Sequence, residues 1–254
     1  MHRQITPEFM DELSVNPSEL DRALRYIRGI NRWLGGAAAL IRHLEAWTRG
    51  WERGQELSLL DVGTGSADIP LEALRWARGR GIRLQVTGID RHPGTLELAR
   101  EHVIAATRDL DSSEVADAFT LVQLDASDLD QRFSPASFDY VHAGMFLHHL
   151  DDDHIVRVLR SMDRAARRGI VWNDLVRSRV GYGAIHLMTL GQPRIIRHDA
   201  TVSVRAGFTR VEAMELGRSA GIDYCHYQWN LFTHRFTFAG EKVRDKDAAR
   251  SELE

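Results

Sequence analysis

The chain has 254 residues, of which 43% are hydrophobic and 27% are charged, an ordinary composition for a globular protein. Its formal net charge of −3 argues against a nucleic-acid-binding protein, because binding to phosphate backbones normally needs a basic surface. The single cysteine, Cys225, excludes an intrachain disulfide, and the sequence has neither the apolar core of a signal peptide nor a membrane-length apolar run, so we expect a cytoplasmic protein.

The first part of the chain predicts helices. Apolar residues recur at helical spacing from residue 18 to about residue 49, and Gly35-Gly36 should divide this region into two helices. We expect residues 1–54 to form a helical lid, with residues 28–33 folded over the ligand, since water-excluding lids are common in enzymes. The alternative is a helical pair that packs elsewhere on the fold.

Strands and helices alternate through the middle of the chain. Short continuous apolar runs predict strands that are buried on both faces. The predicted strands are 57–62, 83–89, 119–124, 138–143 and 170–174, and the predicted helices between them are 66–78, 93–107 and 152–166. This order implies right-handed crossovers and a parallel sheet with helices on both faces.

An unusually long segment, residues 175–208, follows the fifth predicted strand. We expect one helix over residues 178–190 and another from Thr201, which would make Asp199 a helix cap. The other interpretation is that His198 and Asp199 line the ligand pocket as a pair. Additions at the strand ends build the site in open α/β sheets, so we expect this insertion and the N-terminal helices to set substrate specificity.

The last part of the chain shows a different pattern. Thr209 to Glu212 matches a capping box in front of a helix. Residues 222–228 and 231–239 read as two strands joined tightly at Trp229-Asn230, and a tight joint means an antiparallel pair. The charged residues 241–254 are predicted to form a disordered tail.

The most informative segment is residues 57–65, Leu-Ser-Leu-Leu-Asp-Val-Gly-Thr-Gly. Gly63 and Gly65 bracket a turn where the backbone must approach a ligand closely. Asp61 can order this loop or accept a hydrogen bond from a ligand ammonium group. Asp90, at the end of the next strand, can accept both hydroxyls of a ribose. The pattern therefore predicts a ligand with a nucleoside and a charged tail.

A nicotinamide dinucleotide is the main rival ligand. Its fingerprint is Gly-x-Gly-x-x-Gly, which sets a pyrophosphate over a helix N-terminus. The residue three positions after Gly65 is Asp68, whose carboxylate would repel a pyrophosphate. A ligand without phosphate tolerates this carboxylate, and the sequence therefore favours such a ligand.

Over residues 55–240 the sequence resembles the class I S-adenosylmethionine-dependent methyltransferases. The resemblance implies an α/β fold: a Rossmann-like, doubly wound, seven-stranded sheet with a terminal antiparallel strand pair, extended by the N-terminal helices and the insertion after the fifth strand. It implies S-adenosylmethionine as the cofactor. It places Asp125 and Ala126 at the adenine, and it puts Ala67 where the family has a third glycine. The residues assigned to the cofactor are Asp61, Gly63, Thr64, Gly65, Asp68, Asp90, Arg91, Asp125, Ala126 and Ala143.

Three candidate catalytic residues follow predicted strands or lie in the insertion: His148, Asp174 and His198. A histidine such as His148 could accept a proton from a phenol, although Leu-His-His-Leu could equally cap the next helix. Asp174 either faces the same cleft or forms a turn. We predict no metal, because the adjacent His148 and His149 should face different ways and there is no His-x-x-x-His motif or cysteine pair.

The leading hypothesis is methyl transfer from S-adenosylmethionine to a small neutral or aromatic metabolite, with oxygen favoured as the acceptor atom over nitrogen or carbon. The net charge and the size of the insertion favour a small-molecule substrate, with neither nucleic acid nor membrane as a partner. Two alternatives stay open: an NAD-dependent oxidoreductase and a catalytically silent S-adenosylmethionine-binding partner protein. The sequence does not predict the oligomeric state.

Overall fold

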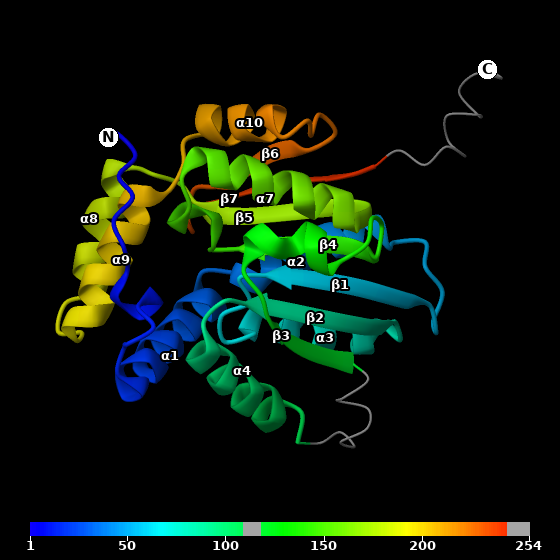
Figure 1. The fold of residues 1–254 in the computed structure, drawn as a ribbon, viewed down its shortest axis with the longest axis horizontal. Helices are drawn as coiled ribbons and strands as arrows, with labels where there is room; N and C mark the ends of the chain where they lie inside the picture. Colours follow the sequence, from blue (N-terminus) through cyan, green and yellow to red (C-terminus); the bar gives the residue numbers. More distant parts are fainter. Residues whose placement is uncertain (109–117, 243–254) are drawn as a thin grey trace.

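The strands of the protein form a seven-stranded sheet in the order β3-β2-β1-β4-β5-β7-β6 (Figure 1). The computed structural model describes residues 1–108 and 118–242. The strands are β1 (Glu56–Val62), β2 (Arg83–Asp90), β3 (Phe119–Gln123), β4 (Phe138–Gly144), β5 (Ala166–Leu175), β6 (His226–Asn230) and β7 (Arg235–Glu241). The first five strands are parallel, and β7 lies antiparallel between β5 and β6. The predicted fold class is confirmed.

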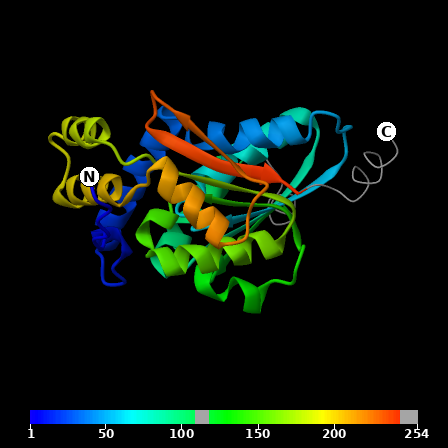
Figure 2. The same ribbon diagram turned by 90° about the horizontal axis from the view of Figure 1, so that it is seen from above.

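Helices cover both faces of the sheet (Figure 2). Those described are α1 (Pro17–Trp33), α2 (Gly36–Trp47), α3 (Asp68–Arg80), α4 (Pro93–Ala106), α6 (Leu129–Arg132), α7 (Asp152–Ala165), α8 (Arg179–Met188), α9 (Arg194–Ala206) and α10 (Arg210–Ser219), with 3₁₀ turns η1 (Phe9–Asp11), η2 (Ala126–Asp128) and η3 (Leu147–His149). α2, α3 and α4 bury their apolar residues on one face, whereas α7 and α10 do so on the other.

Local sequence signals explain where several helices begin. Gly35 has a left-handed φ of 66° and separates α1 from α2, as predicted. Asp151 accepts the amide of His154 at the start of α7. The predicted capping box of Thr209 and Glu212 is present at the start of α10.

Two predicted boundaries were wrong. Trp229 and Asn230 belong to β6, so the connection to β7 is residues 231–234. α9 begins at Arg194, directly after Pro193, so Asp199 lies inside this helix and does not cap one. Proline fixes a φ that suits the start of a helix, so Pro193 explains why α9 begins before Thr201. The predicted disordered tail lies almost entirely outside the described residues.

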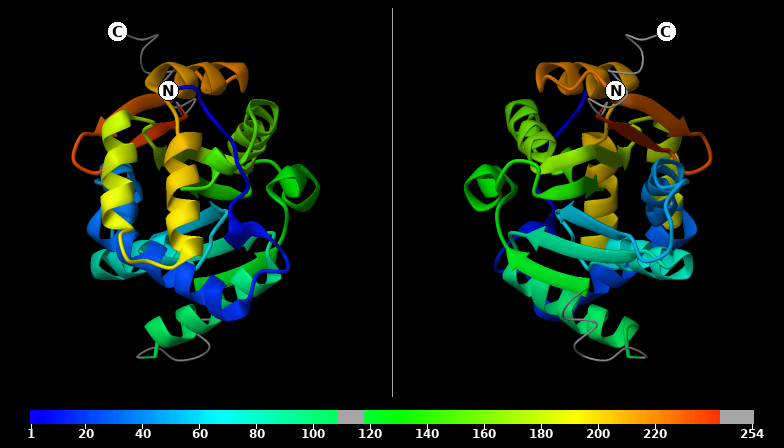
Figure 3. Two further views of the ribbon diagram at one scale, coloured as in Figure 1. Left: turned by 90° about the vertical axis from the view of Figure 1, so that its left-hand side faces the viewer. Right: turned by 90° about the vertical axis from the view of Figure 1, so that its right-hand side faces the viewer.

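The carboxyl ends of the parallel strands are covered by segments from both ends of the chain. Figure 3 shows α8, α9 and the N-terminal segment, residues 1–12, lying across this edge. α1 contacts α4 and α9 beside them, whereas α2 contacts α3, β5 and β7 on the face of the sheet. The arrangement encloses the edge at which open α/β sheets bind ligands.

α10 packs closely on β7, and substitution of a glycine at this contact tests the packing. A Cβ added at Gly217 would lie 2.3 Å from Cζ of Phe238, which is buried, so Gly217→Ala should destabilise the fold by about 1–3 kcal/mol through overpacking. Gly79 in α3 has open space around the same position, and Gly79→Ala should stabilise the fold by about 0.5–1 kcal/mol. Chemical denaturation measures both changes, and equal stability of the two variants would refute the packing of α10 described here.

Candidate functional site

A cavity of about 550 Å³ lies at the carboxyl edge of the sheet, a size typical of small-molecule sites. Its walls come from the N-terminal segment, α1, the strand ends, α8 and α9. The predicted cofactor residues that line it are Asp61, Gly63, Thr64, Gly65, Asp68, Asp90, Arg91, Asp125 and Ala126. Ala143 does not, since it is fully buried in β4 and its neighbour Gly144 lines the cavity instead.

The glycine turn after β1 has left-handed φ angles of 69° at Gly63 and 55° at Gly65. A Cβ at Gly63 would lie 2.4 Å from the Phe146 ring, so packing within the protein already requires glycine there. Nothing lies within 4 Å of the equivalent position at Gly65, which leaves room for a ligand. Ala67 has a φ of 59° and is fully buried, a conformation that favours the glycine usually found there.

Asp61 is held in place by two buried partners. Its Oδ1 lies 2.5 Å from Nδ1 of His142, the residue opposite it on β4, and its Oδ2 accepts the Thr64 hydroxyl at 2.7 Å. These contacts fix the glycine turn against the strand ends. Asp61 therefore orders the loop, which is one of the two roles expected of it.

Asp90 joins the ends of β1 and β2. One carboxylate oxygen accepts the amide of Gly65 at 3.1 Å and the other accepts the amide of His92 at 2.9 Å. Burial raises the pKa of Asp90 above its usual value, although these two amides oppose the shift. A carboxylate offers about four acceptor sites, so acceptors remain for ligand hydroxyls.

A buried cation lies close to Asp68. The Asp68 carboxylate accepts Nδ2 of Asn31 at 2.9 Å, and Nη2 of Arg235 donates to Oδ1 of the same asparagine at 2.9 Å. Burial lowers the pKa of Arg235 to about 10, against the raising effect of Asp68 and Asp174. Its Nε and Nη1 have no hydrogen-bond partner among the described residues. Arg235 thus gives the cavity wall an incompletely paired positive charge.

His148 and Asp174, both predicted catalytic residues, form a buried pair. Nδ1 of His148 lies 2.7 Å from Oδ1 of Asp174, and the Trp172 indole donates to Oδ2 at 3.2 Å. Burial opposes charge on His148, but Asp174 and Glu8 outweigh it and raise its pKa to about 10. His148 lines the cavity, whereas Asp174 lies behind it and orients the ring.

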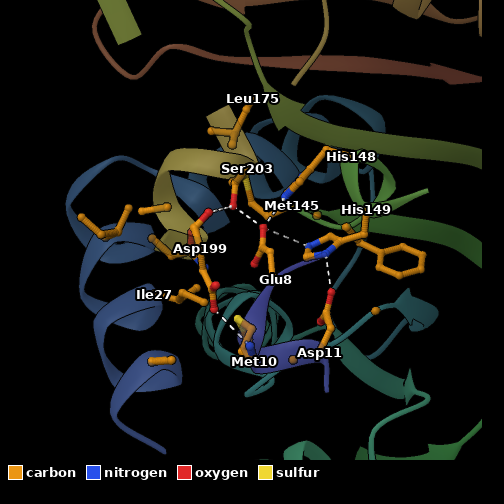
Figure 4. Close-up of a pocket in the computed structure, with 18 of the residues that line it drawn as sticks. Glu8, Met10, Asp11, Ile27, Met145, His148, His149, Leu175, Asp199 and Ser203 are labelled. Carbon is orange, nitrogen blue, oxygen red and sulfur yellow. Dashed lines mark hydrogen bonds and ion pairs between the residues drawn. The ribbon is translucent and has the colours of Figure 1, made fainter. Parts of the chain in front are cut away.

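The N-terminal segment adds acidic residues that the sequence analysis did not find (Figure 4). Oε1 of Glu8 lies 3.6 Å from Nε2 of His148 and 4.0 Å from Nε2 of His149. Asp11 contacts Nδ1 of His149 at 2.7 Å. Residues 5–12 show no periodicity and match no motif, so no sequence signal placed these carboxylates at the site.

His198, the third predicted catalytic residue, does not line the cavity. Its ring stacks on Phe9 with centroids 3.9 Å apart, and its Nδ1 lies 2.9 Å from Asp199. Asp199 does line the cavity, and it accepts the amides of Phe9 and Met10 at 2.8 and 3.1 Å. The carboxylate therefore caps η1 across space and fastens the N-terminal segment, a role that depends on the tertiary fold.

Comparison with known proteins gives a family match over part of the chain. Residues 59–169 match the family described as "Methyltransferase domain". The matched residues begin in β1 and end in β5, and the fold around them is that of the class I S-adenosylmethionine-dependent methyltransferases. A search of curated proteins finds no match.

Solved structures of methyltransferases share the fold. A methyltransferase from Aquifex aeolicus is 14% identical with a TM-score of 0.57, and the match covers 90% of this chain and 99% of that one. A candidate O-methyltransferase from Nostoc punctiforme is 17% identical with a TM-score of 0.55, over 84% of this chain and 60% of that one. Magnesium protoporphyrin IX methyltransferase from Synechocystis, with bound S-adenosylhomocysteine, is 13% identical with a TM-score of 0.51, over 80% and 82%.

The chain spans only 60 to 66% of the length of three of the matched structures, including the Nostoc protein. In residues 1–108 and 118–242 of the chain, no helix combines the length and apolar character required to cross a bilayer.

The residues at the carboxyl edge fit S-adenosylmethionine, which is bound in one of the matched methyltransferase structures. Gly65 leaves open space, Asp90 keeps free acceptors for ribose hydroxyls, and the exposed Asp125 can face an adenine amine. Asp68 at the start of α3 suits a ligand without phosphate. When bound, the cofactor supplies a methyl group activated by a sulfonium; the role of these residues is to bind and orient it.

The position of Asp90 generates a binding prediction. Asp90→Asn should weaken S-adenosylhomocysteine binding roughly 10- to 100-fold, because an amide offers fewer acceptors for ribose hydroxyls than a carboxylate. Isothermal titration calorimetry measures the change. The control is Glu72→Gln, which alters an exposed ion pair with Arg75 on α3. Unchanged affinity in Asp90→Asn would contradict the assignment.

Proposed function

We propose that the protein transfers a methyl group from S-adenosylmethionine to a small neutral or aromatic metabolite, with oxygen as the favoured acceptor atom. One observation carries the proposal. The cavity that contains the glycine turn and Asp90 also contains an apolar region, beside which lies a group of polar side chains, Glu8, His148 and His149. In this proposal the cofactor and the acceptor occupy separate parts of the same cavity.

The apolar lining supports an uncharged acceptor. It includes Leu24, Ile27, Ile30, Met145, Leu175, Ile185, Met188, Ile196 and Val204. The sulfonium loses its charge as the methyl group moves, so a site that excludes water favours the reaction, and alignment supplies much of the remaining acceleration. A polymeric acceptor would not fit a cavity of about 550 Å³.

The polar group supports oxygen as the acceptor atom. A hydroxyl must lose its proton before or during attack, and hydrogen-bonding groups beside it assist this step. Nε2 of His148 and Oε1 of Glu8 are both on the cavity wall, and Asp174 fixes the ring of His148. A hydroxyl that reaches them can donate to Glu8 and be oriented by the imidazole. A nitrogen or carbon acceptor depends less on a pair of hydrogen-bonding groups such as Glu8 and His148.

The N-terminal residues 1–54 and the insertion 175–208 supply the acceptor end in this proposal. Residues 5–12 and α1 line the cavity, and so do α8 and α9 from the insertion. α2 packs on the sheet, so the covering role belongs to the part of the extension before residue 35. Matched structures named as an arsenic(III) methyltransferase and a magnesium protoporphyrin IX methyltransferase act on small acceptors, which supports the same class here.

Substitution of the polar group separates catalysis from cofactor binding. His148→Gln should lower kcat about 10²- to 10⁴-fold, because the oriented ring beside the acceptor oxygen is lost. The affinity for S-adenosylhomocysteine should stay within about twofold, since the glycine turn and Asp90 are untouched. The control is His154→Gln, which removes an exposed imidazole that also contacts a carboxylate, Asp151. Equal kcat in the two variants would remove His148 from the mechanism.

The experiment that tests the proposed function is a screen of phenols, other hydroxylated metabolites, amines and carbon acids with radiolabelled S-adenosylmethionine. We expect label to appear on a hydroxylated aromatic compound. Calorimetric titration with S-adenosylhomocysteine and with NAD accompanies the screen. Binding of NAD alone would overturn the proposal in favour of an oxidoreductase, and cofactor binding without any methylated acceptor would favour a silent binding protein.

A further inference from the structure

Three potential metal ligands meet on the cavity wall, from segments far apart in the sequence. They are Oε1 of Glu8 in the N-terminal segment and Nε2 of His148 and His149 in η3 (Figure 4). Glu8 lies 3.6 Å from the first imidazole nitrogen and 4.0 Å from the second, and all three ligand atoms lie within 4.8 Å of one another. The expectation that the two adjacent histidines would face different ways is wrong. They lie on a 3₁₀ turn, and the centroids of their rings are only 4.3 Å from each other.

Both imidazoles have the outer hydrogen bond that is typical of metal-binding histidines. Nδ1 of His148 lies 2.7 Å from Asp174, and Nδ1 of His149 lies 2.7 Å from Asp11. A histidine that binds a metal through one ring nitrogen almost always donates the other N–H to a carboxylate, a carbonyl or water, which fixes the tautomer. The same arrangement here directs Nε2 of both rings toward Glu8, where a metal ion would take the place of a proton on each nitrogen.

Glu8 is supported in the way expected of a carboxylate ligand. It is only 5% exposed, and the Ser203 hydroxyl on α9 contacts its Oε1. Carboxylates that bind metals are usually hydrogen-bonded in turn by outer groups. The partners of the three side chains thus come from three elements: Asp11 from η1, Asp174 from β5 and Ser203 from α9.

The charges in this region favour a cation. The carboxylates of Glu8, Asp11 and Asp174 surround two imidazoles in a largely buried space. A fourth, Asp199, lies on the adjacent turn of α9 and is also buried. Buried carboxylates are costly unless they are paired with cations or bind a metal. A divalent ion bound by the two imidazoles and Glu8 would replace the protons that otherwise balance these carboxylates, so metal binding would release protons.

We propose that Glu8, His148 and His149 bind a divalent transition metal ion of the Zn²⁺ class, with at least one coordination position open to the cavity. Two imidazoles and one carboxylate are a ligand set of catalytic zinc sites. Bonds of about 2.0–2.1 Å in a tetrahedral site place ligand atoms about 3.3 Å apart. The distances from Glu8, 3.6 and 4.0 Å, would need to shorten by about 0.3 and 0.7 Å, and the two imidazole nitrogens, which lie within 4.8 Å of each other, would also need to reach this separation.

The metal would join the N-terminal segment to the methyltransferase domain. Glu8 belongs to a segment that also contacts α9, where Asp199 accepts the amides of Phe9 and Met10. The ion would therefore fasten residues 5–12 over the cavity, in addition to offering a position for an acceptor oxygen. The fastening role follows from the ligand positions alone and does not depend on the proposed acceptor.

The test uses the full chain without an added histidine tag, stripped with EDTA and titrated with Zn²⁺ by calorimetry in the absence of cofactor and acceptor. We expect one equivalent to bind. Glu8→Gln and His149→Gln should each weaken binding by more than about 100-fold, and Asp11→Asn by about 10- to 100-fold, the range seen for outer hydrogen-bond partners. Substitution with Co²⁺ gives a second measurement, a visible absorption band that Glu8→Gln should abolish.

The matched control is His154→Gln. His154 also contacts a carboxylate through Nδ1 at 2.7 Å, but it is exposed, and the described residues place no metal-binding cluster around it. This variant should bind Zn²⁺ like the unchanged protein. Failure to bind one equivalent, or equal affinity in Glu8→Gln and His154→Gln, would overturn the metal site. Binding of S-adenosylhomocysteine measured on the same samples keeps this result separate from a failure of the proposed methyl transfer.

Discussion

Charge buried at the carboxyl edge of the sheet is the constraint on which the rest of the structure depends. Asp61, Asp174 and Arg235 lie at the ends of β1, β5 and β7, and each is less than 5% exposed. An unpaired charge in such a place is strongly unfavourable, and removal of one partner from a buried pair costs about 3–5 kcal/mol. The fold must therefore bring a partner to every one of them.

These partners explain the shape of the cavity. His142 on β4 pairs with Asp61 and positions the glycine turn, and His148 pairs with Asp174 and turns its Nε2 toward the cavity. Asn31 from α1 links Arg235 to Asp68 at the start of α3. The same contacts that satisfy buried charge thus hold α1 and η3 against the strand ends. The contacts that stabilise this edge of the fold are therefore also the contacts that set the geometry of the site.

The sequence predicted the parts of the structure that local patterns specify. Buried strands of continuous apolar residues, the glycine turn and the Thr209–Glu212 capping box follow from short-range rules, so the fold class could be predicted, and most residues assigned to the cofactor do line the cavity. His148 and Asp174 were expected near the site because they follow strands whose carboxyl ends meet at one edge. Their direct pairing, however, is a property of the tertiary structure.

The remainder of the site could not be predicted because it is assembled from distant segments. Glu8 and Asp11 lie in a stretch without periodicity, and only the closed fold brings them to His148 and His149. Asp199 resembled a local cap in the sequence, yet it caps η1 from another part of the chain. His198 was assigned to the pocket with it, but a helix turns consecutive side chains in different directions, and this ring stacks on Phe9 instead.

The central claim is that one cavity holds the cofactor at the glycine turn and Asp90 while it presents the methyl acceptor to Glu8, His148 and His149. A crystal structure with bound S-adenosylhomocysteine tests this most directly. The account predicts ribose hydroxyls on the Asp90 carboxylate and a sulfur atom that faces the apolar region beside His148. A sulfur atom directed away from that region, with the three side chains out of reach, would contradict it.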